Sequence, residues 1–428
     1  MTYTRGALVS LIARAVAIGL GTLTAIALAR WLGPADRGAY GVVTSVAALV
    51  TMVANLGLGD AQTHFVGRDP SRLPRAFGNA LLFSTLAGIL AGSFLFVLRI
   101  PLAQAMPTFA DDRVLAIVIV TLPALLLYGF VHPLLQAVRR FALSAALVAF
   151  SYALLLATIW ILVVSLGLGL IGALVGWCVA HVLLVIVAIV PLARRGPVVT
   201  LPRLAELRAE LRLGTDTWLN STAALFVSRV GLLVAGALIA PVDTGRYAVA
   251  LTLVELLWYG ADSASVALKP LLARVAGSGE VPPTAEVTRT VVALTAIGAA
   301  VMFVAAEPIL ALLFGVEYAP GATAVRWLLP GIVGFSVWRV LFADLIGRGA
   351  PGRAIASALA AAAVATAGCL ALIPSAGAVG AAGATSAAYL IATTMLVRTY
   401  GRLTGTSAAD LIVPRGDDIG RLWSRVRA

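Results

Sequence analysis

The sequence predicts an all-α, polytopic membrane protein with about twelve transmembrane helices in two parallel six-helix repeats. Three observations lead to this fold class. Hydrophobic residues fill 61% of the 428 positions and charged residues only 12%, whereas a soluble domain carries roughly 25% charged residues. Apolar segments of about 20 residues, enough to cross a hydrocarbon core of ~30 Å, recur along the chain. Finally, the phrase Pro-x-Asp-x-Gly-x-Tyr occurs at 34–40 and again at 241–247.

The apolar segments predict both the membrane spans and the domain organisation. The expected spans are 8–29, 38–59, 76–98, 114–136, 141–165, 168–192, 217–239, 245–266, 288–306, 322–345, 353–373 and 377–397. They form an N-terminal bundle (1–192) and a C-terminal bundle (217–397), with a cytoplasmic linker (193–216) and a cytoplasmic tail (398–428). Within the linker, segment 201–213 has apolar residues at helical spacing with charged residues between them, which predicts an amphipathic helix on the membrane face.

The basic residues predict the orientation. Of the 31 Lys and Arg, 22 fall in the tails and even-numbered loops, six in the odd-numbered loops and three inside spans. By the positive-inside rule, both termini are cytoplasmic. The net charge of +12 is then explained without a nucleic-acid partner. Residues 5–29 also resemble a cleavable signal peptide, but they correspond to 212–236 in the second half, so we expect them to be retained.

The repeat extends beyond the opening phrase. Shifting the second to fourth spans by 207 positions places them close to the eighth to tenth, and Gly-x-x-Gly-Ala begins at 169 and at 377. Because six spans is an even number, both copies enter the membrane from the same side, which predicts a parallel repeat. In the repeated phrase, we expect proline to end one helix, aspartate to cap the next and tyrosine to lie at the membrane interface. The paired glycines are expected to allow close helix packing.

The N-terminal region resembles a known family. Leu28-Ala29-Arg30-Trp31-Leu32-Gly33-Pro34, then Gly38-Ala39-Tyr40 and Asn55-Leu56-Gly57-Leu58-Gly59, are similar to the signature of polysaccharide flippases of the multidrug/oligosaccharidyl-lipid/polysaccharide exporter superfamily. The resemblance in residues covers about the first 70 positions. It implies a MATE-like two-bundle transporter fold and an undecaprenyl-diphosphate-linked oligosaccharide as cargo in the bacterial cytoplasmic (inner) membrane. Lipid II flippases commonly have fourteen spans, so the twelve expected here argue against that assignment.

An anionic diphosphate needs cations at membrane depth, and charged residues within spans are functional candidates. Arg14, Arg229 and Arg339 lie in the first, seventh and tenth spans and are the expected diphosphate-binding residues. Each has an alternative role. Arg14 can snorkel to the cytoplasmic interface. Arg229 can pair with Glu255, and Arg339 can pair with Asp344.

Glu255 is the carboxylate in the middle of a span, and two roles remain open for it. It is either an ion-coupling site for H⁺ or Na⁺ or a structural counter-ion to Arg229. Under the 207-residue offset, Arg229 and Glu255 align with the uncharged Thr22 and Ala48. His132 is expected to pack near the end of the fourth span, and His181 faces an undetermined side of the sixth.

The expected function is therefore a flippase or exporter of a polyprenyl-diphosphate-linked oligosaccharide, working by alternating access with cation coupling. The alternatives are a multidrug or small-molecule cation antiporter, whose cavity would favour acidic residues, and a membrane-embedded glycosyltransferase or polymerase, which would need large outer loops. The sequence contains no Walker loop, so we do not expect ATP-driven transport by this chain alone, and it contains no His/Cys cluster with metal-ligand spacing. We expect a transporter with no enzyme activity, no cofactor and no metal. Expected partners are the lipid-linked glycan, membrane lipids, H⁺ or Na⁺, and glycan polymerase or assembly proteins.

Overall fold

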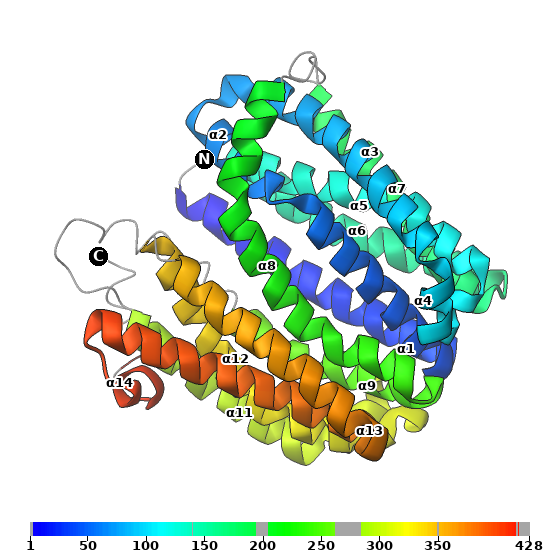
Figure 1. The fold of residues 1–428 in the computed structure, drawn as a ribbon, viewed down its shortest axis with the longest axis vertical. Coiled ribbons are helices and arrows are strands. Elements are labelled where there is room, and N and C mark those ends of the chain that lie inside the picture. The colour runs from blue at the N-terminus through cyan, green and yellow to red at the C-terminus, as the bar shows by residue number, and fades with distance from the viewer. Residues whose placement is uncertain are drawn as a thin grey trace. The chain divides into compact units, whose positions relative to one another are not determined.

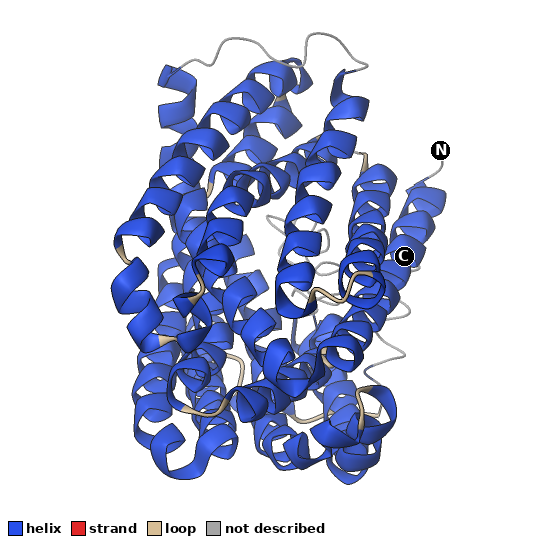
Figure 2. Cartoon of the chain, turned by 90° about the vertical axis from the view of Figure 1, so that its right-hand side faces the viewer, coloured by secondary structure: helices blue, strands red, loops and turns tan. Residues whose placement is uncertain are grey.

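The computed structural model describes residues 3–138, 140–193, 204–261, 284–348, 351–416 and 418. In these ranges the chain forms helices joined by short turns and contains no strand (Figure 2). Nine of the described helices are long and apolar enough to cross a membrane by length and composition. The predicted all-helical, multi-pass membrane fold is thus confirmed.

The chain divides into two compact units, Met1–Thr222 and Ala223–Ala428, and the division falls inside helix α8 (Leu204–Leu238). The helices that lie wholly in the N-terminal unit are α1 (Tyr3–Asn55), α2 (Leu58–Arg68), α3 (Leu73–Val97), α4 (Arg99–Ala105), α5 (Asp112–Ala137), α6 (Phe141–Ile159) and α7 (Gly169–Ala193) (Figure 1). Short turns of helix join them: η1 (Pro70–Arg72), η2 (Pro107–Ala110) and the π-helical η3 (Trp160–Ser165). Helix α1 includes the first predicted span and the second as far as Asn55. At their junction, Gly33 adopts a φ of 72° ahead of Pro34, so the proline kinks the chain as expected.

The C-terminal unit has corresponding helices. They are α9 (Pro241–Glu255), α11 (Thr284–Leu313), η4 (Val316–Gly321), α12 (Ala322–Gly347), α13 (Pro351–Thr404) and α14 (Ala408–Ile412). Helix α13 includes the last two predicted spans, which meet at Gly377 (φ 54°). The end of the eighth predicted span, from residue 262, lies outside the described residues, as do 194–203 of the predicted linker.

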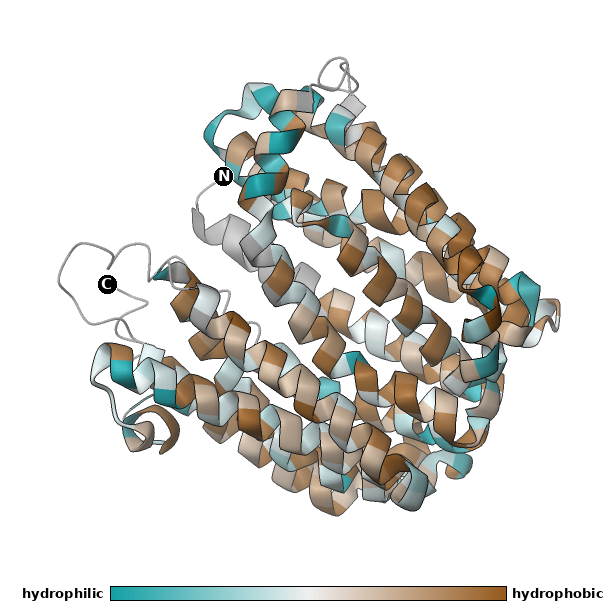
Figure 3. Ribbon diagram, in the orientation of Figure 1, coloured by the Kyte–Doolittle hydropathy of each residue, from teal (hydrophilic) through white to brown (hydrophobic). Residues whose placement is uncertain are grey.

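Helices α3 and α11 occupy equivalent places in the two repeats and expose equivalent faces. On α3 the exposed residues include Leu90, Phe94 and Val97, and on α11 they include Ile297, Val301 and Val304. Each residue of the second set lies 207 positions after its counterpart. Large apolar side chains exposed along a spanning helix are suited to lipid, and most of the α3 ribbon has the brown of hydrophobic residues (Figure 3).

The paired glycine motifs also take the same structure in both units. Gly169 and Gly377 have left-handed φ values of 50° and 54°, which glycine adopts without strain. Three residues on, a Cβ atom on Gly172 would lie 2.8 Å from the Leu162 carbonyl oxygen, and one on Gly380 would lie 2.4 Å from that of Leu372. The prediction of close packing at these glycines is confirmed.

Two expectations for the repeated phrase are wrong. Tyr40 and Tyr247 are buried inside their units instead of lying at a membrane interface, because each side chain points inward from the start of its helix segment. Asp243 does not cap α9, whose first turn lacks a side-chain cap. Its carboxylate instead accepts a hydrogen bond of 2.9 Å from Arg246, one turn later on the same helix.

The predicted amphipathic segment forms the beginning of α8 and runs without a break into the seventh predicted span. Its apolar side chains Leu207 and Leu211 pack against the core of the N-terminal unit. Between them Glu210, only 6% exposed, accepts hydrogen bonds from Gln62 of α2 (3.3 Å) and Asn79 of α3 (3.4 Å). The segment therefore attaches α8 to the N-terminal unit through a buried carboxylate.

This contact makes the stability of the N-terminal unit depend on pH. Burial raises the pKa of Glu210 from 4.5 to about 6, although hydrogen bonds from Gln62 and Asn79 oppose the rise. The folded protein binds this proton more tightly than the unfolded chain does. The free energy of unfolding therefore falls as pH rises from about 4.5 to about 6, by roughly 1–2 kcal/mol. Thermal unfolding of the purified protein between pH 4.5 and 7.5 measures this loss of stability.

The variant Glu210→Gln should flatten that pH profile and be the more stable protein at pH 7.5, because a neutral amide at this position needs no desolvated charge. Glu206→Gln is the matched control one turn earlier, since Glu206 is only half-buried and pairs with Arg75 at 3.5 Å. An unchanged pH profile in Glu210→Gln would contradict the assignment.

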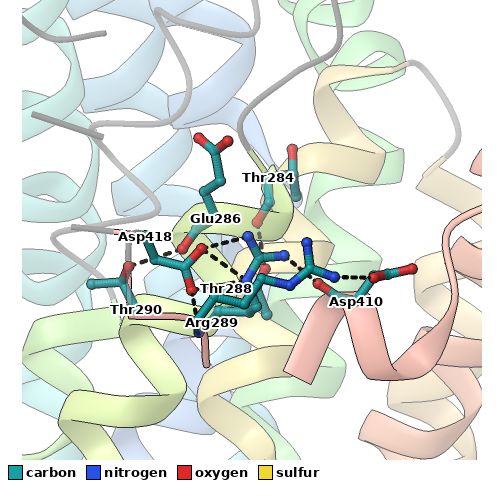
Figure 4. Close-up of polar contacts among 8 residues, drawn as sticks. Thr284, Glu286, Thr288, Arg289, Thr290, Asp410 and Asp418 are labelled. Atoms are coloured by element: carbon teal, nitrogen blue, oxygen red, sulfur yellow. Dashed lines mark hydrogen bonds and ion pairs between the residues drawn. The ribbon is translucent and has the colours of Figure 1, made fainter. Parts of the chain in front are cut away.

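A second buried polar cluster anchors the end of the described chain (Figure 4). Arg289 of α11 is 3% exposed, and its Nε donates to both carboxylate oxygens of Asp418 at 3.0 and 2.9 Å. A second guanidinium nitrogen donates to the backbone carbonyl of Asp410, in α14. The hydrogen bonds from Arg289 to the Asp418 carboxylate hold the pKa of that carboxyl group below its usual range. One arginine thus binds the tail at two points.

Replacing Arg289 by alanine should release this part of the tail, because it leaves the buried Asp418 carboxylate without its cation. We expect hydrogen exchange in 408–416 to become at least several-fold faster, and trypsin to cut at Arg415 sooner. The exposed Arg402, in the last turn of α13, provides the control variant Arg402→Ala. Equal exchange rates in the two variants would show that Arg289 does not retain the tail.

Candidate functional site

A cavity of about 280 Å³ lies within the C-terminal unit. The residues lining it that carry chemistry are Arg229 of α8, Glu255 at the end of α9, Trp258 and Tyr259 just beyond it, and Phe335 and Arg339 of α12. The lining therefore contains two cationic groups and one carboxylate, together with three aromatic rings. All of these residues come from segments that the sequence predicts to lie in the membrane.

Arg229 and Glu255 form an ion pair at the cavity. The Nη1 atom of Arg229 lies 3.2 Å from Oε1 of Glu255, and the side chains are 29% and 20% exposed. The two atoms are close, but their alignment does not make a hydrogen bond, and Oε1 is a buried acceptor without one. Glu255 is also the last residue of α9, where the negative end of the helix dipole favours a cation as well.

Arg339 contributes the second positive charge from a different helix. Its guanidinium carbon lies 5.2 Å from the ring centre of Trp258 and 5.8 Å from that of Phe335. Phe335 in turn stacks on Trp338 with ring centres 4.9 Å apart and on Tyr389 with ring centres 4.2 Å apart. These contacts use the flat face of the guanidinium group.

Further polar atoms next to this cavity lack hydrogen-bond partners. They are the indole N–H of Trp258 and the hydroxyl of Tyr389, both buried. The rings of these two residues lie 5.9 Å apart. Unsatisfied buried polar groups are costly and uncommon. Their concentration here is typical of a site that receives a polar ligand.

The structure brings three of the four predicted site residues together: Arg229, Glu255 and Arg339 line one cavity. The fourth, Arg14, belongs to α1, but its side chain lies outside the described residues. Asp344, the alternative partner considered for Arg339, is fully buried and accepts a hydrogen bond from Arg348 at 2.9 Å. The binding and coupling roles of these residues remain predictions.

Sequence reasoning did not identify the aromatic part of the site. Trp258, Phe335 and Tyr389 lie in segments that are apolar on every side, so no periodicity shows which face turns toward the cavity. Among the described residues, no group of three His, Cys, Asp or Glu side chains could hold a metal ion.

Solved structures show which fold these helices build. The lipid II flippase MurJ, in an inward closed conformation, aligns with a TM-score of 0.77 and 12% identity over 98% of this chain and 92% of its own. An inward-facing multidrug resistance MATE family transporter of the MOP superfamily aligns with a TM-score of 0.68 and 17% identity, over 90% of this chain and 96% of its own. The eukaryotic MATE transporter AtDTX14 aligns with a TM-score of 0.68 and 15% identity, over 97% of this chain and 96% of its own. At these identities the likeness concerns the fold alone.

The sequence itself identifies the family. Among curated protein sequences, none matches this chain. The family model described as "Polysaccharide biosynthesis protein" matches residues 3–276, which is more than half of the chain. This agrees with the resemblance of the N-terminal signature to polysaccharide flippases. The chain therefore belongs to the polysaccharide biosynthesis protein family and is a multi-pass membrane protein with the fold of MOP-superfamily transporters.

Proposed function

We propose that this protein is a flippase that moves a polyprenyl-diphosphate-linked oligosaccharide across a bacterial cytoplasmic membrane by alternating access, coupled to H⁺ or Na⁺. The observation that carries the proposal is the convergence of Arg229 and Arg339 on one cavity in the membrane-spanning region. Guanidinium groups present their N–H donors in a planar fork that matches phosphate oxygens, so two of them on one cavity suit a diphosphate. Arg14 is the third proposed diphosphate ligand.

Glu255 is the proposed ion-coupling residue. Its carboxylate lies at the negative end of α9 and beside Arg229, so H⁺ or Na⁺ would compete with the guanidinium for the same oxygen atoms. Both termini are proposed to be cytoplasmic, given the 22-to-6 distribution of basic residues between the two sets of loops and tails. Glycan polymerase or assembly proteins would then receive the translocated lipid at the outer face.

A multidrug or small-molecule cation antiporter remains the alternative, since the aromatic rings of Trp258 and Phe335 next to Glu255 could also accept an organic cation. The two arginines oppose that reading, because they would repel such a ligand at short range. The proposed function therefore predicts that charge, and not aromatic surface, decides which substrate is moved.

Reconstituted transport tests this proposal directly. The full-length protein is placed in liposomes that contain a polyprenyl-diphosphate disaccharide with a nitrobenzoxadiazole label on its sugar. Dithionite, which does not cross the membrane, then reports the fraction of label on each side while a pH or Na⁺ gradient is applied. We expect translocation above that of protein-free liposomes, and a faster rate with the gradient than without it.

Efflux of tetraphenylphosphonium from the same liposomes provides the opposing measurement. If that cation is moved along the gradient and the labelled lipid is not, the protein is a cation antiporter and the flippase proposal is wrong. Movement of the lipid at a rate that neither gradient alters would remove the coupling role of Glu255 and leave the flippase activity.

A further inference from the structure

The N-terminal unit contains a second and larger cavity, of about 550 Å³. That volume lies in the usual range for small-ligand sites. Its walls come from α1, α5, α6 and α7, and its principal side chains are Tyr40, Tyr128, His132, Tyr152, Trp177 and His181. The expectation that His132 packs within the fourth span is therefore incomplete, because its ring also faces this cavity. Among the described residues that line it, none is an arginine, lysine, aspartate or glutamate.

The internal repeat shows that this cavity is the counterpart of the charged one. Tyr128 and His132 lie 207 positions before Phe335 and Arg339, and His181 lies 208 positions before Tyr389. Ala48 takes the place of Glu255. Two corresponding positions, 128/335 and 132/339, thus line cavities of different chemistry in the two repeats. One has arginines and a carboxylate, and the other has imidazole, phenol and indole groups.

The rings of the N-terminal cavity are held in place by one another. Trp177 and His181 meet edge to face with ring centres 5.4 Å apart, and Tyr128 lies 6.5 Å from His181 and 6.3 Å from His132. The Nδ1 atom of His181 donates to the Trp177 carbonyl at 2.8 Å. In the neutral ring Nε2 is therefore an acceptor. The hydroxyl of Ser151, which also lines the cavity, donates to the Val148 carbonyl at 2.7 Å.

This chemistry suits an uncharged sugar. Ring hydrogens on carbon in a pyranose are weakly positive and are attracted to the negative face of an aromatic ring. The hydroxyl groups of a sugar need both donors and acceptors, which imidazole, phenol and Ser or Thr side chains provide. Among the lining side chains that the structure describes, a diphosphate would find no permanent cation and an organic cation would find no carboxylate.

We propose that the N-terminal cavity, lined by Trp177, Tyr128, Tyr152, His132 and His181, is a binding subsite for one or two uncharged pyranose rings. The inference rests on the proposed function insofar as the sugar belongs to the glycan of the translocated lipid. The two repeats have then specialised, with the C-terminal cavity binding the diphosphate and the N-terminal cavity binding the carbohydrate.

Saturation-transfer difference NMR tests for the sugar subsite. The full-length protein is placed in lipid nanodiscs free of sugar-containing detergent, since a maltoside would compete. The probes are methyl glycosides of glucose, galactose, mannose, rhamnose and N-acetylglucosamine. We expect ring-proton signals from at least one of them, and at least tenfold weaker binding in Trp177→Leu, which keeps apolar volume but removes the stacking face. His181→Ala should weaken binding without loss of the folded state.

Two matched variants control for indirect effects. Trp160→Ala removes an indole that is exposed on the surface of the same unit, and Arg326→Ala removes an arginine of the C-terminal unit that donates to the Phe303 carbonyl, so both should bind the glycosides as the unmodified protein does. The inference is overturned if no glycoside binds, or if binding survives both Trp177→Leu and His181→Ala. Binding of tetraphenylphosphonium in place of glycosides, and its loss in Trp177→Leu, would overturn it in favour of an organic-cation site.

The transport measurement separates this inference from the proposed function. If the labelled lipid is translocated but no glycoside binds, the sugar subsite is wrong and the flippase stands. If glycosides bind in a Trp177-dependent way but no lipid-linked glycan is moved, the subsite stands and the flippase proposal fails.

Discussion

Arg229→Ala is expected to lower the rate of glycan-lipid translocation at least tenfold while leaving the protein folded. The substitution removes one of two guanidinium groups from the cavity and leaves Glu255, 3.2 Å away in the unmodified protein, as an uncompensated negative charge. Hydrogen bonds to charged groups contribute about 1.5–3 kcal/mol, equivalent to roughly tenfold to 150-fold in rate or affinity. Repulsion between Glu255 and a diphosphate adds to that loss.

The dithionite assay in proteoliposomes measures this rate, and two further variants interpret it. Arg326→Ala removes an arginine from the same helix as Arg339 but away from the cavity, where its side chain donates to the Phe303 carbonyl at 3.1 Å, and should leave the rate unchanged. The double variant Arg229→Ala/Glu255→Gln removes the isolated negative charge. It should restore any lost stability without restoring transport. Full transport by Arg229→Ala would show that this arginine serves Glu255 and not the cargo.

Asp344→Ala is expected to cause the largest loss of stability of any single substitution considered, roughly 3–5 kcal/mol. Asp344 is fully buried, and three donors converge on its carboxylate. They are the Thr284 hydroxyl of α11 at 2.9 Å, the Tyr400 hydroxyl of α13 at 2.6 Å and Arg348 Nε at 2.9 Å. One side chain of α12 therefore joins three helices of the C-terminal unit, and its removal leaves buried donors without an acceptor.

Unfolding of the purified protein by SDS, followed by circular dichroism, measures the effect. Asp344→Asn keeps an acceptor oxygen and should lose less than Asp344→Ala. Asp243→Ala is the control, because that carboxylate is about half exposed and pairs with Arg246 on the surface, where an ion pair contributes about 0–1 kcal/mol. Equal unfolding midpoints for Asp344→Ala and Asp243→Ala would contradict the structural role.

The candidate site could be predicted in part because charge is conspicuous within a membrane span. The sequence leaves a pair between Arg229 and Glu255 open as one alternative, and the structure contains that pair, since each group is costly in hydrocarbon without a partner of opposite sign. The position of Arg339 was less predictable. Asp344 was a plausible partner by sequence distance, but the structure gives that carboxylate to Arg348, Thr284 and Tyr400, and Arg339 lies against Trp258 and Phe335.

The aromatic residues explain why the remaining parts of the sites were not predicted. Tyr40 and Tyr247 were expected at an interface, where isolated tyrosines are favoured, yet both are buried. His132 was expected to pack and instead also lines a cavity. A spanning helix is apolar on both its lipid face and its protein face, so the hydrophobic pattern does not distinguish them.

Composition and segment length are enough to specify that this chain is an all-helical membrane protein. An apolar segment of about 20 residues can hydrogen-bond all of its backbone groups in lipid only by forming a helix. The repeat of 207–208 positions and the family signature are likewise properties of the sequence. The two cavities are not determined in this way, because each requires side chains from three or four helices to converge. That convergence depends on how each helix is rotated about its axis, which is set by packing against its neighbours and not by any local pattern of residues.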